Sequence, residues 1–302
     1  MTRRGFLGGI AGVATVHAAP RPVGLGFGTY ALWMLRWEDS LELIARTGYD
    51  GVELALMPDW PTAPQRLTRG DRSRLRGMLD DLGLALPALL DNLQLADAVQ
   101  THAQNTERLR RAIELGNDIV PGKPPIFETV LGREPGEWEA VKNRMVDEIG
   151  ELTREAADGG TVICFKPHAG DAANNVERSL WLVEQVGSRH FRCTYDYSHL
   201  WLSGHELVRS LQALIPVSPY IHLKDARRTP AKHEFLLPGD GPTDYVEMFR
   251  QLGHLGYEGY ATVEVSAQIH RLSDFEPIAT ANLCYERMAA AFEEAGLPRP
   301  NV

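Results

Sequence analysis

Cysteine and net positive charge are both scarce in this chain. Three Cys in 302 residues are too few for a disulfide scaffold. The 31 basic residues are outnumbered by 40 acidic ones, and the formal charge of −9 disfavours nucleic acid as a partner. No apolar run is long enough to span a membrane, and no Gly/Ser linker separates two domains. With 44% hydrophobic residues, the sequence is that of an ordinary globular protein.

The first 18 residues have the pattern of an export signal. Arg3 and Arg4 precede a short apolar run rich in Gly and Ala, and small residues follow up to Ala18. Segment 2–7 (TRRGFL) resembles the twin-arginine signal, which exports proteins that are already folded. We therefore expect cleavage after Ala18, a mature domain over residues 19–302, and a periplasmic or extracellular location. Since residues 1–18 hold two Arg and no acidic residue, cleavage changes the formal charge from −9 to −11.

After Pro22, short apolar runs alternate with longer segments of helical period, which is typical of repeated β-α units. Eight such units predict an α/β fold, a single (β/α)8 TIM barrel, with an open doubly wound sheet as the alternative. The strands are expected at 23–27, 51–55, 84–89, 118–120, 161–166, 191–195, 220–224 and 260–265. The helices are expected at 37–47, 71–82, 101–115, 137–157, 175–186, 205–214, 244–255 and 277–295. Gly48, Gly116 and Gly187 follow helical segments, where a left-handed residue is favoured.

The longest irregular stretches, 57–65, 121–136, 167–174 and 226–242, each follow an expected strand. In a barrel such loops lie at the C-terminal face, where active sites are built. Side chains two apart share a face of a strand, and polar residues fall on the inner face near these ends. They are Lys166 and His168, Arg192, Thr194 and Asp196, His222 and Lys224, and Thr262 and Glu264.

An Asp, a His and a Glu at corresponding ends of neighbouring strands can meet at one point. Ligands of that mix suit Mn²⁺, Co²⁺, Mg²⁺ or Zn²⁺. A lone inward His is more often a hydrogen-bonded core residue. Three residues of ligand type at three strand ends favour a functional centre instead, because each buried charge needs compensation.

Several motifs together make the sequence similar to the xylose isomerase-like TIM barrels, the sugar phosphate isomerase/epimerase family. The similarity covers most of the mature chain. The motifs are 41–54 (LELIARTGYDGVEL), 195–199 (YDYSH), 221–225 (IHLKD), 237–241 (LPGDG), 256–259 (GYEG) and 263–265 (VEV).

By this resemblance, Asp196, His222 and Glu264 match three of the four side chains that hold a divalent metal in the family's epimerases. The resemblance implies proton removal from a carbon next to a carbonyl, with an enediolate intermediate. Carboxylates move the proton, and Glu264 is the expected base or proton shuttle. The side chains expected to orient the substrate are His168, His199, Arg228 and Glu53, the last being either a substrate contact or a carboxylate behind the ligands.

The fifth strand departs from the family pattern. The family usually has Glu-x-His there, and this chain has Lys166-Pro167-His168. A cation at the first position would repel a divalent ion by several kcal/mol, given about 4 kcal/mol for two unit charges at 4 Å and an effective dielectric near 20. Lys166 would then be a neutral base, turn away from a three-ligand site, replace the metal by pairing with Asp196 and Glu264, or extend to the rim without a role.

The sequence therefore predicts a sugar isomerase or epimerase that acts on a free sugar or keto-sugar at a metal or Lys-assisted site. The same enolate chemistry permits β-elimination, so a keto-sugar lyase or dehydratase is the nearest alternative. A second alternative is a non-catalytic carbohydrate-binding barrel that has lost its metal. A DNA-repair endonuclease on the same barrel is disfavoured by the mature charge of −11 and the export signal. Barrels of this family often associate through helices, so a homo-oligomer is compatible with the sequence.

Overall fold

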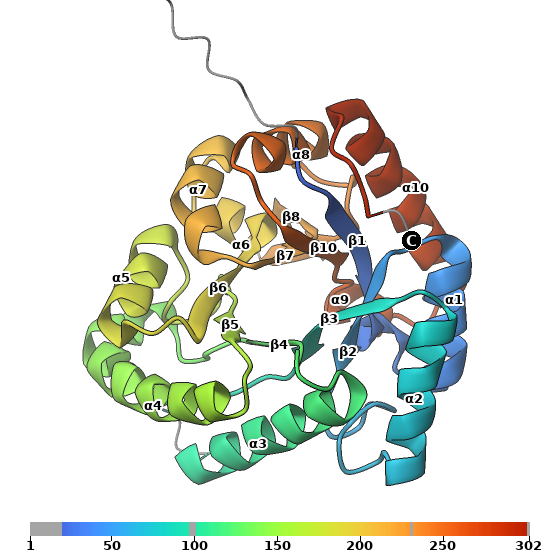
Figure 1. The fold of residues 1–302 in the computed structure, drawn as a ribbon. Coiled ribbons are helices and arrows are strands. Elements are labelled where there is room, and N and C mark those ends of the chain that lie inside the picture. Colours follow the sequence, from blue (N-terminus) through green and yellow to red (C-terminus); the bar gives the residue numbers. More distant parts are fainter. Residues whose placement is uncertain (1–19, 97–100, 230–231, 301–302) are drawn as a thin grey trace, which may run out of the picture.

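The computed structural model describes residues 20–96, 101–229 and 232–300. Within them, parallel strands close into a barrel in the order β1-β10-β7-β6-β5-β4-β3-β2, which confirms the predicted (β/α)8 TIM barrel over the open sheet. Helices surround this barrel (Figure 1). The predicted export signal at residues 1–18 lies outside the described residues. The barrel strands are β1 (Val23–Gly28), β2 (Gly51–Ala55), β3 (Ala85–Leu90), β4 (Ile126–Thr129), β5 (Ile163–Phe165), β6 (Phe191–Asp196), β7 (Tyr220–Leu223) and β10 (Gly259–Val263).

The helices agree with the predicted amphipathic segments to within a few residues at each end. They are α1 (Trp37–Thr47), α2 (Arg69–Asp81), α3 (His102–Ile119), α4 (Trp138–Asp158), α5 (Val176–Val186), α7 (Leu207–Leu214), α8 (Tyr245–His254) and α10 (Pro277–Ala295). Two short helices that the sequence pattern did not predict follow strands, α6 (Tyr197–Leu202) and α9 (Ala267–His270). Among the described residues, no helix combines the length and apolar character needed to cross a bilayer.

Local signals set the ends of these helices. Thr68 caps α2 by accepting the Asp71 N–H at 3.1 Å, while the Asp71 carboxylate accepts the Thr68 N–H at 3.0 Å. Gly48 ends α1 with φ +105° and Gly187 ends α5 with φ +63°, as the sequence predicted. These caps satisfy backbone groups that the helices leave unpaired, so the chain turns into the next strand at defined residues.

The prediction for the fourth strand was wrong. Residues 118–120 were expected to be a strand, but α3 continues to Ile119 and β4 lies at Ile126–Thr129, inside the expected loop 121–136. The buried residues Leu115 and Ile119 extend the helical spacing, and Pro121 then prevents the helix from continuing. Gly116 is therefore inside α3 and not at its end, and an added Cβ there would lie 3.0 Å from Pro125.

A small antiparallel hairpin occupies part of the expected irregular stretch 226–242. It consists of β8 (Asp225–Arg228) and β9 (His233–Leu236). The Asp225 carboxylate accepts the backbone N–H of Gly239 at 2.8 Å and of Thr243 at 3.2 Å, which folds the following segment back toward the barrel. The hairpin places the Phe235 ring 4.7 Å from that of His199, at the C-terminal end of the barrel.

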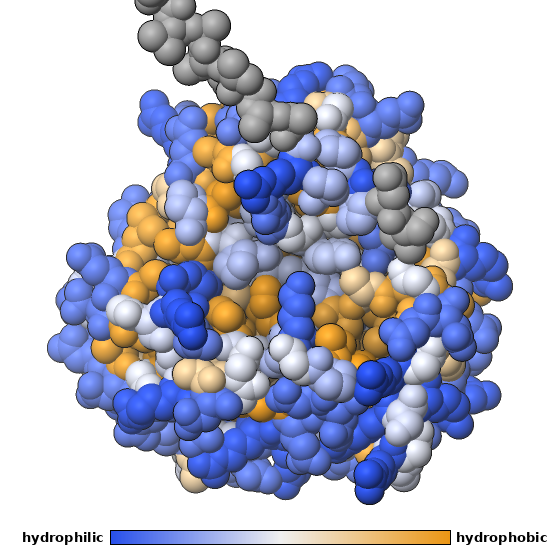
Figure 2. Space-filling view, viewed as in Figure 1, coloured by the Kyte–Doolittle hydropathy of each residue, from blue (hydrophilic) through white to orange (hydrophobic). Residues whose placement is uncertain are grey.

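The two ends of the described chain meet on the opposite, N-terminal face, where the Val23 N–H donates to the Pro298 carbonyl at 2.9 Å. Figure 2 shows this face, with hydrophilic side chains at its rim and apolar ones gathered further in. Inside the barrel, β1 contributes glycines, and a Cβ on Gly26 would lie 2.5 Å from Thr262 Oγ1. Because the glycines of β1 have no side chains, they leave room for the side chains of the neighbouring strands.

Candidate active site

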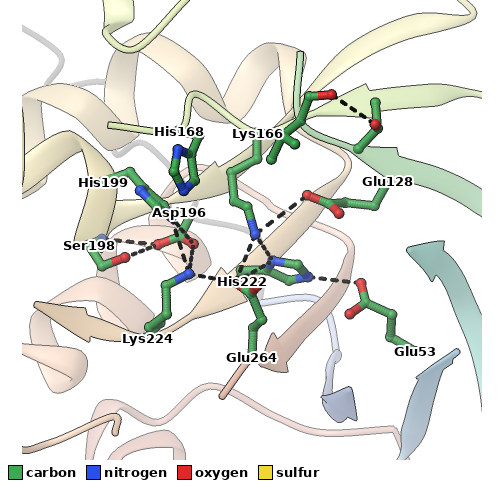
Figure 3. A network of polar contacts seen from close by, with 12 residues as sticks. Glu53, Glu128, Lys166, His168, Asp196, Ser198, His199, His222, Lys224 and Glu264 are labelled. Carbon is green, nitrogen blue, oxygen red and sulfur yellow. Dashed lines mark hydrogen bonds and ion pairs between the residues drawn. The ribbon is translucent and has the colours of Figure 1, made fainter. Parts of the chain in front are cut away.

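Charged side chains from six barrel strands converge at the C-terminal end of the barrel interior (Figure 3). Because parallel strands end at one face, residues far apart in sequence meet there. None of these residues is more than 7% exposed. They are Glu53 on β2, Glu128 on β4, Lys166 after β5, Asp196 on β6, His222 on β7 with Lys224 just beyond it, and Glu264 after β10.

Glu264 is the centre of the cluster, since its Oε2 accepts hydrogen bonds from both lysines. The distances are 2.7 Å to Lys166 Nζ and 2.6 Å to Lys224 Nζ. Lys224 Nζ also lies 3.2 Å from Asp196 Oδ2, and Lys166 Nζ lies 3.8 Å from Glu128 Oε1. The two ammonium groups thus link carboxylates from three strands.

His222 lies between two carboxylates. Its Nε2 is 2.8 Å from Glu53 Oε2 and its Nδ1 is 3.3 Å from Glu264 Oε2. Burial lowers the pKa of His222, but the Glu53, Glu128 and Glu264 carboxylates together more than offset this and raise the pKa to about 10. Glu53 holds the ring in place through its contact with Nε2.

Burial and ion pairing shift the pKa values of the other charged groups in different directions. Burial lowers the pKa of Lys166, but Glu264 and Glu128 raise it above its ordinary value, so Lys166 is an ammonium. Burial raises the pKa of Glu264, but Lys166 and Lys224 more than reverse this and hold it well below the ordinary value. Glu128 is the exception. Burial raises its pKa to about 7, and neither of its oxygens has a hydrogen-bond partner among the residues that the structure describes.

A pocket of about 300 Å³ opens above this cluster. Three of the buried charges line its floor, namely Lys166, Lys224 and Glu264. Its walls combine apolar side chains with groups that can bind hydroxyls, and they include Tyr30, Met57, Leu90, Asn92, Val130, His168, Phe235, Ser266 and Gln268. The pocket therefore offers a small polar molecule two cations and a carboxylate at its closed end, with a mixed wall around them.

The structure separates the predicted substrate-orienting residues. His168 lines the pocket, and its ring lies 4.3 Å from that of His199. His199 is fully buried; burial and the nearby Lys224 hold its pKa well below the ordinary value, so it is neutral. Glu53 is also fully buried, and its carboxylate contacts the expected ligand His222 and not the pocket. Arg228 is exposed outside the pocket and donates to the Trp201 and Leu202 carbonyls at 2.7 Å each.

Sequence reasoning missed Glu128 and undervalued Lys224. Glu128 was overlooked because the fourth strand was placed too early, although Ile126–Thr129 carries the strand-like sequence IFET after two prolines. Lys224 was assigned to the inner face with His222, but no role was given to it. The signal that could have identified it is its position two residues after His222, at the end of a barrel strand.

The predicted metal ligands do come together. Asp196, His222 and Glu264 have ligand atoms within 4.8 Å of one another, and Glu53, Glu128 and His222 form a second such group. The ammonium groups of Lys166 and Lys224, however, already bind the oxygens that an ion would need. Each would repel a divalent ion, at about 4 kcal/mol per pair of unit charges at 4 Å and an effective dielectric near 20. In this arrangement the residues do not fit a divalent metal.

Comparison with known proteins identifies the family. Residues 41–292 match the model of the xylose isomerase-like TIM barrel family, and the chain belongs to that family. It is 24% identical over 285 residues to an inosose dehydratase of Geobacillus kaustophilus (strain HTA426), a match that covers 84% of this chain and 85% of the relative. An inosose dehydratase of Geobacillus thermodenitrificans (strain NG80-2) is 28% identical over 179 residues, which is 54% of this chain and 59% of that relative.

Solved structures share the fold. A 3-keto-D-glucoside 4-epimerase from E. coli superimposes with a TM-score of 0.68 at 16% identity, over 88% of this chain and 99% of that one. The zinc-binding IOLI protein superimposes with a TM-score of 0.72 at 20% identity, over 91% and 98% of the two chains. Dehydratases and an epimerase thus occur among proteins similar to this chain.

Proposed function

We propose that this protein is a sugar isomerase or epimerase that removes a proton from the carbon next to the carbonyl of a polyhydroxylated ketone. The observation that carries the proposal is the floor of the pocket, where one carboxylate, Glu264, lies between the ammonium groups of Lys166 and Lys224. Proton abstraction next to a carbonyl needs a base beside a site that stabilises negative oxygen. These three side chains supply both within one pocket.

In this proposal, the two ammonium groups hold the substrate's carbonyl oxygen and stabilise the negative charge that develops on it. A substrate oxygen that accepts hydrogen bonds from Lys166 and Lys224 weakens their contacts with Glu264, which makes that carboxylate a stronger base. Glu264 then takes the proton from the neighbouring carbon and returns it to another carbon or to the other face. Lys166 is not the base, because the nearby carboxylates keep it protonated.

The test is solvent deuterium exchange into a panel of keto-sugars, 3-keto-glycosides and inososes, followed by mass spectrometry and product analysis. The panel is run with the parent protein, with Glu264→Gln and with Glu258→Gln. Glu258 is the matched control, because it directly precedes β10 whereas Glu264 directly follows it. We expect the parent and Glu258→Gln to incorporate deuterium and Glu264→Gln to lose at least about a hundredfold in rate. Sugar binding without exchange in the parent would refute the enzyme and identify a carbohydrate-binding barrel.

Dehydration is the second candidate function. It is favoured by the similarity to an inosose dehydratase over 84% of this chain. β-Elimination shares the proton abstraction step, but the enolate then expels a hydroxyl that must receive a proton. His168 at the pocket wall is the side chain proposed to supply it. Product analysis separates the two functions, because dehydration lowers the substrate mass by one water and isomerisation does not change it.

We also propose that the protein acts outside the cytoplasm. The proposal is supported by Arg3 and Arg4 ahead of an apolar run and small residues up to Ala18. The conservative pair Arg3→Lys with Arg4→Lys is expected to keep the full-length protein in the cytoplasm. Fractionation and sequencing of the mature N-terminus check this, and export of the variant at the parent's level would contradict it.

A further inference from the structure

Two ammonium groups fill the space among the side chains that would hold a cation. Lys166 Nζ lies 2.7 Å from Glu264 Oε2 and 3.1 Å from His222 Nδ1. Lys224 Nζ lies 2.6 Å from the same Glu264 oxygen and 3.2 Å from Asp196 Oδ2. Each of Asp196, His222 and Glu264 therefore has a lysine nitrogen at contact distance (Figure 3).

The carboxylates beside the pocket already have cationic partners. Lys166 and Lys224 contact Glu264, Lys224 also contacts Asp196, and His222 lies between Glu53 and Glu264. All of these side chains are buried. A divalent ion at Asp196, His222 and Glu264 would have to displace these ammonium groups or lie beside them in the barrel interior, where unpaired charge is costly.

The second group of possible ligands also has positive charge beside it. This group consists of Glu53, Glu128 and His222, and Lys166 Nζ lies 3.8 Å from Glu128 Oε1. His222 Nε2 is already bound to Glu53 at 2.8 Å. The single side chain Lys166 thus puts positive charge beside both sets of ligands.

We infer that Lys166 and Lys224 replace the divalent cation in this barrel, so that the protein takes no metal at Asp196, His222 and Glu264 and uses the two ammonium groups to bind the negative oxygen of its substrate. The statement about metal stands on the cluster alone. The statement about substrate oxygen rests on the proposed function. A divalent ion and an ammonium pair offer the same charge to an enediolate, but the ammonium groups act through hydrogen bonds and not through coordination.

The experiment measures metal content and metal affinity in the mature protein. The parent, Lys166→Glu, Lys166→Gln and the double variant Lys166→Glu with Lys224→Met are each incubated with Mn²⁺, Co²⁺ or Zn²⁺, desalted, and analysed for bound metal, with calorimetric titration for affinity. We expect less than about 0.1 ion per chain in the parent and about one in the two Lys166→Glu proteins, with affinity at least about a hundredfold higher than in the parent. Lys166→Gln, which removes the charge without adding a ligand, is expected to be intermediate.

Two results would overturn the inference. One is a parent protein that retains about one divalent ion per chain and loses it on Asp196→Ala. The other is a Lys166→Glu protein that gains no metal although circular dichroism and its melting curve show that it is folded. If Lys166→Glu does not fold, the same criterion is applied to Lys166→Gln. Deuterium exchange by metal-free parent protein in EDTA tests the substrate half separately. Exchange that needs added metal would refute it, whereas no exchange under any condition would refute the proposed function and leave the metal result standing.

Discussion

Lys166→Met removes the buried ammonium group and leaves a side chain of similar length. Lys166 is 3% exposed and contacts Glu264 at 2.7 Å and Glu128 at 3.8 Å, so the variant leaves two buried carboxylates without this partner. Removing one member of a buried ion pair costs about 3–5 kcal/mol. Met fills much of the same volume, so the packing loss is small beside this.

The cost should depend on pH, because Glu128 can take up a proton. Its pKa is already raised to about 7 by burial, with Lys166 opposing the rise, and it rises further when Lys166 is removed. A carboxyl group with a raised pKa in the folded state binds more protons there than in the unfolded state, so stability falls as pH increases. The destabilisation by Lys166→Met is therefore expected to be larger at pH 8.5 than at pH 6, by about 1.4 kcal/mol for each unit of further pKa rise that the interval covers.

The assay is urea unfolding of the mature protein at both pH values, in EDTA so that bound metal does not replace the lost charge. Lys142→Met on α4 is the matched control, because its Nζ pairs with the exposed Glu139 at 2.5 Å on the surface. That pair is expected to contribute about 0–1 kcal/mol, with no difference between the two pH values. A loss below about 1 kcal/mol in Lys166→Met, or the same loss at both pH values, would refute the buried ion pair as the source of the effect.

Two further predictions use the barrel interior. Glu128→Gln removes a carboxyl whose ionisation costs stability as pH rises from about 4.5 to 7. In denaturant unfolding, the free energy of unfolding of the variant should equal that of the parent near pH 5 and exceed it by about 2 kcal/mol at pH 8. Equal free energies of unfolding at pH 8 would contradict this. Gly26→Ala puts a Cβ 2.5 Å from the buried Thr262 Oγ1 and should destabilise by about 1–3 kcal/mol. Gly77→Ala in α2 puts no described atom within 4 Å of the new Cβ and should stabilise the protein by about 1 kcal/mol, so the melting temperatures of the two variants must move in opposite directions.

The order of the barrel elements and much of its polar interior could be predicted from the sequence. Period-two alternation assigns Asp196, His222 and Glu264 to the inner face, and the structure puts Asp196 and His222 in register on neighbouring strands. Helical periodicity located the helices for the same reason, since both periods are properties of the local backbone. The prediction of the fourth strand was wrong because residues 118–120 fit either the helical or the strand period. They are helical because α3 continues until Pro121 stops it.

The partners of each charge were decided only by the tertiary structure. The sequence left four roles open for Lys166, and closure of the barrel brings its Nζ to 2.7 Å from Glu264, 98 residues away in the chain. The same closure joins Lys224 to Glu264 and gives His222 the buried Glu53 as its partner. Sequence determines these residue types and the faces they occupy through local periodicity. Which charges lie within contact distance, and therefore whether a lysine or an ion balances the carboxylates, depends on the packing of strands distant in sequence, because electrostatic energy depends on distance and burial.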